Sequence, residues 1–121
     1  MAEPTDAEVS AALAARGVPR HVIEAGAQGL ISRWRTFVNQ VEAGYPLGLE
    51  EYRNDLDLRT LIGVTGLAHR VRHEDARLQA ALTSRETEIW SSDAPDPWWT
   101  HGYPAHPGPL LLEDLRAEGI I

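Results

Sequence analysis

The sequence contains no cysteine, which excludes disulfide bonds, thiolate catalysis and zinc sites built on cysteine. Lysine is also absent, so all eleven basic residues are arginine, a bias typical of a G+C-rich genome. No apolar run approaches the roughly 18 to 20 residues of a membrane span, and the first residues lack the basic and apolar stretches of a secretion signal. We therefore expect a cytoplasmic protein that does not associate with membranes and folds by core packing, without a cofactor.

The length and composition are those of one globular domain, because 43% of the 121 residues are hydrophobic and 24% are charged. A chain of this length buries roughly two-thirds of its unfolded surface, which is enough for one core without a structural metal. The net charge of −7 argues against attraction to nucleic acid or to anionic lipid. A protein partner with a basic surface suits this charge better.

Helical signals dominate the first two-thirds of the chain. Thr5 and Glu8 form a capping-box pattern, which predicts a helix from there to Arg16. A long helix is predicted over about 27–44 by apolar residues at steps of three and four, which are Ala27, Leu30, Ile31, Trp34, Phe37, Val38 and Val41. A third helix should begin near Leu49 and kink or restart around 54–57, where Asn and Asp favour caps.

The steps between Leu67, Val71, Leu78, Leu82 and Ile89 predict a long fourth helix over about 65–89, and no strand pattern competes with it. Prolines in the last third favour extended backbone, so we expect an arm over about 91–109 that lies across the helices and brings Trp98, Trp99 and Tyr103 with it. A short closing helix should follow Pro109. The predicted fold of residues 1–121 is a single all-α domain, a compact bundle of four to five helices closed by this Pro/Trp-rich arm and the final helix.

Asp75 is the first candidate for a functional side chain. It continues the helical face of Val71 and Leu78, which places a carboxylate at the edge of the core. Such a carboxylate needs a partner, and either Arg59 or Arg35 could supply a charged hydrogen bond. The result is either a structural lock, which we favour, or a catalytic acid or base with a perturbed pKa.

His69 and His73 lie four residues apart, which is the spacing of two metal ligands on one helix face. Two ligands do not make a site, the glutamate of the zinc protease motif is missing between them, and two arginines there would repel a cation. His101 and His106 are as consistent with a solvated loop as with further ligands. We therefore predict no metal site.

The basic stretch 69–85 contains Arg70, Arg72, Arg77 and Arg85, and is either a solvated surface or a site for an anionic ligand.

Residues 86–121 carry seven acids and one arginine, and the aromatic arm lies among them. No catalytic motif occurs in the chain. We therefore expect an interaction protein, most concretely an inhibitor or immunity-type protein that masks a basic surface of another protein. The residues predicted to contact this partner are Trp98, Trp99, Tyr103, Asp93, Asp96, Glu113 and Asp114.

Two other functions stay open at this stage. One is a small ligand-binding protein or enzyme with a cavity between the long helices and the arm. Trp34, Tyr52, His69, Arg72, His73 and Asp75 are the residues expected to line that cavity. The other is an oligomeric scaffold that buries a leftover apolar helix face.

Overall fold

The computed structural model describes residues 3–121 and is mostly helical, with a small antiparallel sheet. The elements in chain order are α1 (Asp6–Ala15), α2 (Arg20–Ala43), α3 (Leu49–Val64), a 3₁₀ turn η1 (Ala68–Val71), α4 (Arg72–Ala81), β1 (Leu82–Glu88), a 3₁₀ turn η2 (Trp98–Thr100), β2 (His101–Pro104) and α5 (Pro109–Ala117). Within this described part, no helix has both the length and the apolar character needed to cross a membrane.

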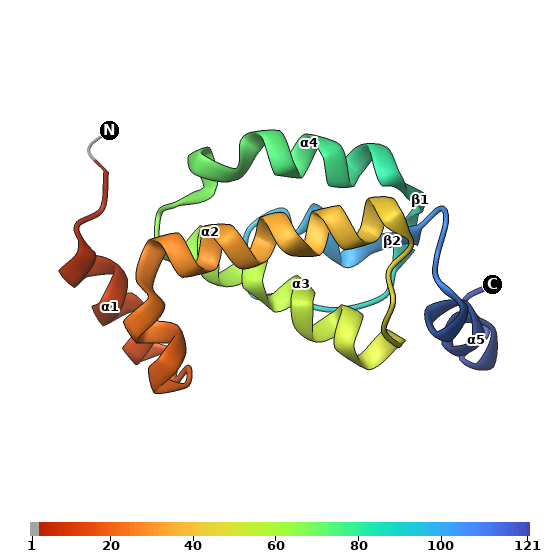
Figure 1. The fold of residues 1–121 in the computed structure, drawn as a ribbon, viewed down its shortest axis with the longest axis horizontal. Coiled ribbons are helices and arrows are strands. Elements are labelled where there is room, and N and C mark those ends of the chain that lie inside the picture. Colours follow the sequence, from red (N-terminus) through yellow and green to blue (C-terminus); the bar gives the residue numbers. More distant parts are fainter. Residues whose placement is uncertain (1–2) are drawn as a thin grey trace.

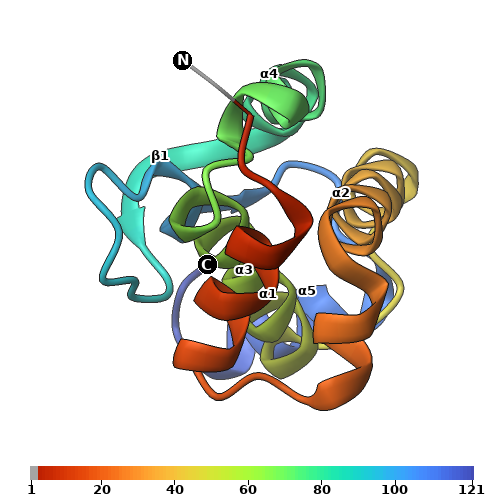
Figure 2. The ribbon, with the colours of Figure 1, turned by 90° about the vertical axis from the view of Figure 1, so that its left-hand side faces the viewer.

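The long helix α2 runs through the middle of the molecule, with α4 along one side and α3 along another (Figure 1). The helix α1 lies at the end that carries the N-terminus, and α5 lies at the opposite end with the C-terminus. Seen from the α1 end, the β1–β2 hairpin and its connecting loop lie on the side of α3 and α4 away from α2 (Figure 2). The helices and the hairpin thus enclose one core.

The predicted core face of α2 is confirmed: Leu30, Ile31, Trp34, Phe37, Val38 and Val41 are all buried. The capping box at Thr5 is also present, because Thr5 Oγ1 accepts from the Glu8 amide and Glu8 accepts from the Thr5 amide. Gly26 has φ +62° and kinks α2, which separates a short first limb from the long amphipathic limb. The capping box thus located the start of α1, and the periodicity of apolar residues located the long limb of α2, although α2 itself begins at Arg20.

Two expectations about helix ends are wrong. The third helix does not kink at 54–57 but continues from Leu49 to Val64, with Leu56 fully buried as an anchor in its middle. The fourth helix does not span 65–89: it begins at Arg72, after the 3₁₀ turn η1, and ends at Ala81, and Leu82–Glu88 form strand β1. The segment 101–104 pairs antiparallel with β1, so the backbone groups of the two strands form hydrogen bonds with each other.

The hairpin is irregular. Leu82 and Thr83 pair with Pro104 and Tyr103, whereas Glu88 pairs with His101, so the register shifts between Thr83 and Glu88. Ser84 has φ +50° at this irregularity, and its hydroxyl donates to the Tyr103 hydroxyl at 3.1 Å. The shift leaves Leu82 and Ile89, at either end of the strand segment, both buried in the core.

Candidate functional site

A buried polar network joins α2, α3 and α4. Asp75 Oδ1 accepts from Trp34 Nε1 at 3.0 Å and from Arg59 Nε at 3.1 Å, and Asp75 Oδ2 accepts from Arg59 Nη2 at 3.0 Å. The guanidinium carbon of Arg59 also lies 4.9 Å from the Trp99 ring centroid. Asp75 and Arg59 are 8% and 7% exposed, so this is a bidentate ion pair removed from water.

The pKa of Asp75 is raised above its ordinary value, because burial outweighs the hydrogen bonds and charge of Arg59 and the bond from Trp34, which lower it. Because a guanidinium stays charged throughout the accessible pH range, Arg59 needs a counter-charge in the core, and the Asp75 carboxyl is positioned to supply it. The residues that donate to Asp75, Trp34 and Arg59, are both buried. The geometry fits a structural lock, the favoured interpretation of Asp75.

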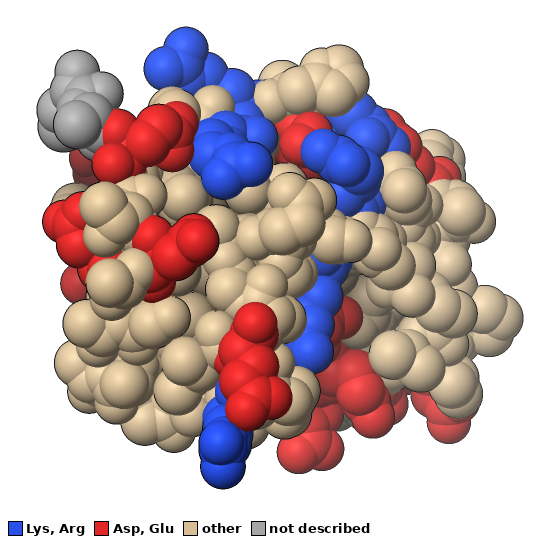
Figure 3. All heavy atoms as spheres, turned by 60° about the vertical axis from the view of Figure 1, so that its left-hand side comes forward, with Lys and Arg blue, Asp and Glu red and all other residues tan. Residues whose placement is uncertain are grey.

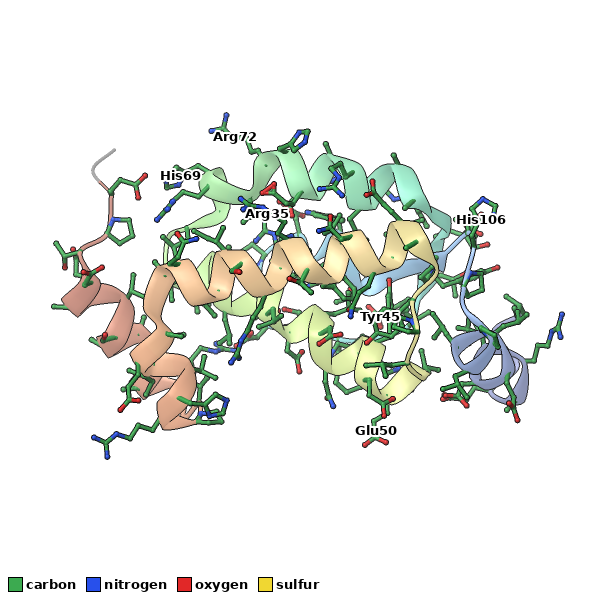
Figure 4. The ribbon with its side chains drawn as sticks, viewed as in Figure 1. Arg35, Tyr45, Glu50, His69, Arg72 and His106 are labelled. Carbon is green, nitrogen blue, oxygen red and sulfur yellow. The ribbon has the colours of Figure 1, made fainter. Side chains whose placement is uncertain are left out.

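The six residues expected to line a cavity lie in two different settings, three in the core and three on the surface. Trp34 and Tyr52 are fully buried, and Tyr52 packs against Phe37 and Tyr45. Asp75 is buried too, against Arg59. The other three lie on the outside: His69 and Arg72 are exposed on the outer side of η1 and α4, as Figure 4 shows, and His73 is exposed as well. The core members and the outer members are therefore separate groups.

The four histidines considered as metal ligands, and the arginines of the basic stretch 69–85, also lie in separate places. His69 Nε2 lies 2.5 Å from Glu3 Oε1, and His101 Nε2 lies 3.7 Å from Glu88 Oε2, whereas His106 is exposed at the other end of the molecule (Figure 4). Among residues 3–121 no three His, Asp or Glu side chains are grouped so that they could hold a metal ion. Arg77 pairs with Glu42 and Asn39, Arg70 and Arg72 are exposed, and Arg85 lies on the hairpin.

Figure 3 shows arginine atoms as a broken band that runs from the top of the molecule toward its centre, with acidic atoms on both sides. Arg35 lies on the side of α2 that faces α4 (Figure 4), where its guanidinium is 3.7 Å from the buried carboxylate of Glu74. The net charge of −7 thus coexists with arginines that lie beside acidic side chains, such as Arg35 beside Glu74 and Arg77 beside Glu42.

The seven predicted partner-binding residues differ in accessibility. Trp99 is buried against Arg59, and its Nε1 has no hydrogen-bond partner within residues 3–121. Asp93 forms two hydrogen bonds with Arg16, both 3.1 Å, which hold the arm against the end of α1. The remaining five are Asp96 and Glu113, which are exposed, and Trp98, Tyr103 and Asp114, which are half-buried.

Asp114 has a structural role that the sequence pattern did not show. Its Oδ2 accepts from the Leu49 amide at 2.9 Å, so a residue of α5 caps the N-terminus of α3. A Cβ atom on Gly48 would lie 2.6 Å from this oxygen, and 3.1 Å from Glu51 Oε2. A larger residue at this position would therefore push the Asp114 carboxylate away from the start of α3.

Segments 44–49 and 106–114 lie side by side at the α5 end. Gly108 approaches the Tyr45 carbonyl so closely that a Cβ atom would be 2.3 Å from it, and Asp114 reaches Leu49. These contacts bracket Leu47 on one segment and Leu110 on the other, which are 43% and 55% exposed. The exposed acids Glu50, Glu51 and Glu113 come from the same two segments or directly follow them. We call Leu47, Leu110, Glu50, Glu51 and Glu113 the acidic end face.

A polar groove of about 490 Å³ opens between α2 and α3. The α2 side contributes Ser32, Arg33, Thr36, Phe37 and Gln40. The α3 side contributes Asn54, Asp55 and Leu58. Sequence reasoning missed this site, although positions 33, 36, 37 and 40 share one helical stripe and provide the signal that was available.

Asp55 is the unusual member of this groove. It is half-buried, and its Oδ2 accepts from the Tyr45 hydroxyl at 2.6 Å. Burial raises the pKa of the Asp55 carboxyl, and the charge of Glu51 raises it further, while the bond from Tyr45 lowers it. Within residues 3–121, neither an arginine nor a histidine forms an ion pair with Asp55.

A second hollow, of about 530 Å³, lies between α3 and the segment 91–93 and has a different character. Its polar groups already satisfy one another: Arg16 pairs with Asp93, the hydroxyls of Thr60 and Ser92 are 2.8 Å apart, and Asp57 accepts from Trp90 Nε1. These bonds attach the arm to the helices, so the hollow has the features of a packing seam.

Comparisons with protein-family models, curated proteins and solved structures each gave no match. The geometry of the described residues is therefore the basis for the functional argument.

Proposed function

We propose that this chain is a small acidic interaction protein, most concretely an inhibitor or immunity-type protein, that binds and masks a basic surface of another protein. The observation that carries the proposal is the acidic end face, where two adjoining segments of the chain carry two exposed leucines and three exposed carboxylates. Exposed leucines beside charged side chains are typical of a contact patch that buries apolar area at its centre and uses charge at its rim.

The charge of this end suits a basic partner. Segments 44–53 and 106–121 contain five acids and two arginines. One of these arginines, Arg53, is already engaged by Glu118 and by the Ile89 carbonyl. Glu50 points away from the helices into solvent (Figure 4), so its carboxylate is accessible to a partner. Electrostatic complementarity of this kind mainly accelerates association and selects the partner.

The structure changes which of the predicted contact residues support the proposal. Trp99 and Asp93 are engaged within the protein, and Asp114 caps α3, so we assign them to sealing and attachment of the arm. Glu113 stays in the proposed contact surface, where it joins residues of α3 and of the preceding loop. Asp96, Trp98 and Tyr103 form the competing surface on the arm.

Affinity capture from the host lysate with paired variants tests this assignment. Two variants alter the acidic end face, Glu50→Gln/Glu113→Gln and Leu47→Ser/Leu110→Ser, and a matched variant, Glu86→Gln/Asp96→Asn, makes the same charge change on the hairpin and arm. We expect one stoichiometric partner with a basic surface, whose capture weakens with salt and is lost with both end-face variants but retained with the matched one.

Equal capture by the wild type and both end-face variants, with helical content unchanged, would reject the acidic end face. If capture were lost with the matched variant and with Trp98→Ala, but not with the end-face variants, the contact surface would lie on the arm. The six residues expected for the alternative function, binding of a small ligand, are divided between the core and the surface. The α2–α3 groove is a better candidate for such a ligand.

A further inference from the structure

The groove between α2 and α3 contains two opposite charges that do not neutralise each other. Arg33 and Asp55 both line it, yet no ion pair joins them, and Arg33 forms none with any other residue of the described chain. Buried or half-buried carboxylates in proteins are normally paired, because removing an ion from water is costly. The Asp55 carboxylate therefore stands out from the buried carboxylates Asp75, which has Arg59, and Glu74, which has Arg35.

The free atoms of the groove define the ligand chemistry. Asp55 Oδ2 is occupied by the Tyr45 hydroxyl, and Oδ1 accepts no hydrogen bond from residues 3–121, so it can accept from a cationic donor. Arg33 offers a guanidinium suited to a carboxylate or phosphate. Neutral amides and hydroxyls lie between the two helices, at Asn54, Gln40 and Thr36.

We propose that this groove binds a small zwitterion, an amino acid or a short peptide, whose ammonium group pairs with Asp55 and whose carboxylate pairs with Arg33. The volume of about 490 Å³ lies within the usual range of small-molecule sites, roughly 300 to 1,000 Å³. The buried ring of Phe37 and the half-buried Leu58 supply the apolar contact for the carbon chain between the two charges.

A metal ion fits this groove poorly. Asp55 is the only carboxylate that lines it, and Arg33 places a positive charge in the same space. A purely anionic ligand would leave Asp55 facing a like charge, and a purely cationic one would do the same to Arg33. The zwitterion satisfies both groups, and it does so independently of the acidic end face proposed for the protein partner.

The test uses the full chain and a defined series of ω-amino acids with increasing chain length: glycine, β-alanine, aminobutyric acid, aminopentanoic acid and aminohexanoic acid. Hexanoate and hexylamine carry one charge each and serve as controls, and glycylglycine represents peptides. Binding is measured by calorimetry and by the amide chemical shifts of α2 and α3. We expect one chain length, or the dipeptide, to bind with a dissociation constant of about 1 mM or tighter, and both controls to bind at least about tenfold more weakly.

Variants locate the site. Asp55→Asn keeps an oxygen for the Tyr45 bond but removes the charge, and Arg33→Gln alters an exposed side chain that folding does not need. Each should weaken the selected ligand by about tenfold or more, whereas Arg72→Gln, which removes an exposed arginine from α4, should not change its affinity. Arg33→Gln keeps the test decisive if Asp55→Asn folds poorly.

Three results would overturn the proposal. One is the absence of binding by every member of the series, and another is equal binding by hexylamine and the ω-amino acids. The third is binding that Asp55→Asn and Arg33→Gln leave unchanged. A ligand that binds only as the dipeptide supports the proposal and assigns the ligand to peptides.

Discussion

Asp75 and Arg59 are oppositely charged groups from α4 and α3, and each has only the other to neutralise it in the core. Two buried charges gain little net stability over apolar residues, because the cost of desolvation cancels much of their attraction. Loss of one partner is different, since the remaining charge stays buried without compensation. The pair therefore specifies how α3 and α4 meet more than it adds to stability.

Asp75→Ala should lower the free energy of unfolding by about 3–5 kcal/mol, because Arg59 is left as an unpaired buried charge. The double variant Arg59→Met/Asp75→Leu should recover part of this loss, because it removes the unpaired charge but still leaves Trp34 Nε1 without its acceptor. Urea titrations followed by tryptophan fluorescence measure both, and Glu86→Ala at an exposed position is the control. If the single and double variants lost the same stability, the charge pair would not be the reason for the loss.

At the scale of elements, the β1–β2 hairpin depends on one glycine. Gly102 has φ +87°, in the left-handed region that other residues rarely adopt. A Cβ atom there would lie 2.7 Å from the Thr83 carbonyl oxygen and 3.3 Å from the Arg85 Cα, both of which are backbone atoms of β1. Neither atom can move without disturbing the strand pairing, so this position requires glycine for two separate reasons.

Gly102→Ala and Gly119→Ala form a matched pair of variants that separates the cost of backbone strain from the cost of the steric contact. Gly119 also has positive φ, +72°, but nothing lies within 4 Å of the position of its added Cβ. Gly119→Ala should cost about 1–2 kcal/mol from backbone strain alone. Gly102→Ala should cost more and should increase hydrogen exchange of the Ile89 and Ala105 amides, which bond to the Thr100 and Ala81 carbonyls at the two ends of the hairpin. If both variants lost the same free energy of unfolding, the contact of the added Cβ with Thr83 would contribute nothing to the cost.

At the scale of the whole molecule, polar contacts of long sequence separation attach the last third of the chain to the helices. Asp114 caps α3, Arg16 pairs with Asp93, and Arg53 donates to the Ile89 carbonyl at 2.8 Å. The Arg16–Asp93 pair is exposed and contributes little, because water and salt screen such pairs. The half-buried cap at Asp114 replaces a hydrogen bond that α3 cannot supply for itself.

Asp114→Ala should therefore lower the free energy of unfolding by about 0.5–2 kcal/mol, the usual cost of a lost N-cap. Its neighbour Glu113 is exposed and is the matched control, so Glu113→Ala should leave stability nearly unchanged. Thermal unfolding and exchange of the Leu49 amide measure the two effects. Rapid exchange at Leu49 in the wild type would contradict the cap itself.

The sequence alone was sufficient for the parts that depend on neighbours three and four residues apart. The apolar stripe of α2 identified its buried face, the capping box identified the start of α1, and helical spacing placed Asp75 at the core. These predictions succeed because a helix satisfies its own backbone, so its pattern repeats within a short window.

Only the tertiary structure decided the features that depend on distant partners. The helical spacing of Leu82 and Ile89 was misleading, because residues 101–104 pair with 82–88 and turn that segment into a strand. Trp98 and Trp99 look alike in the sequence, yet only Trp99 is buried, against Arg59. The cap at Asp114 and the groove at Asp55 likewise arise where helices meet. Contacts between residues far apart in the chain leave no local periodicity, so these features appear only when the whole chain has folded.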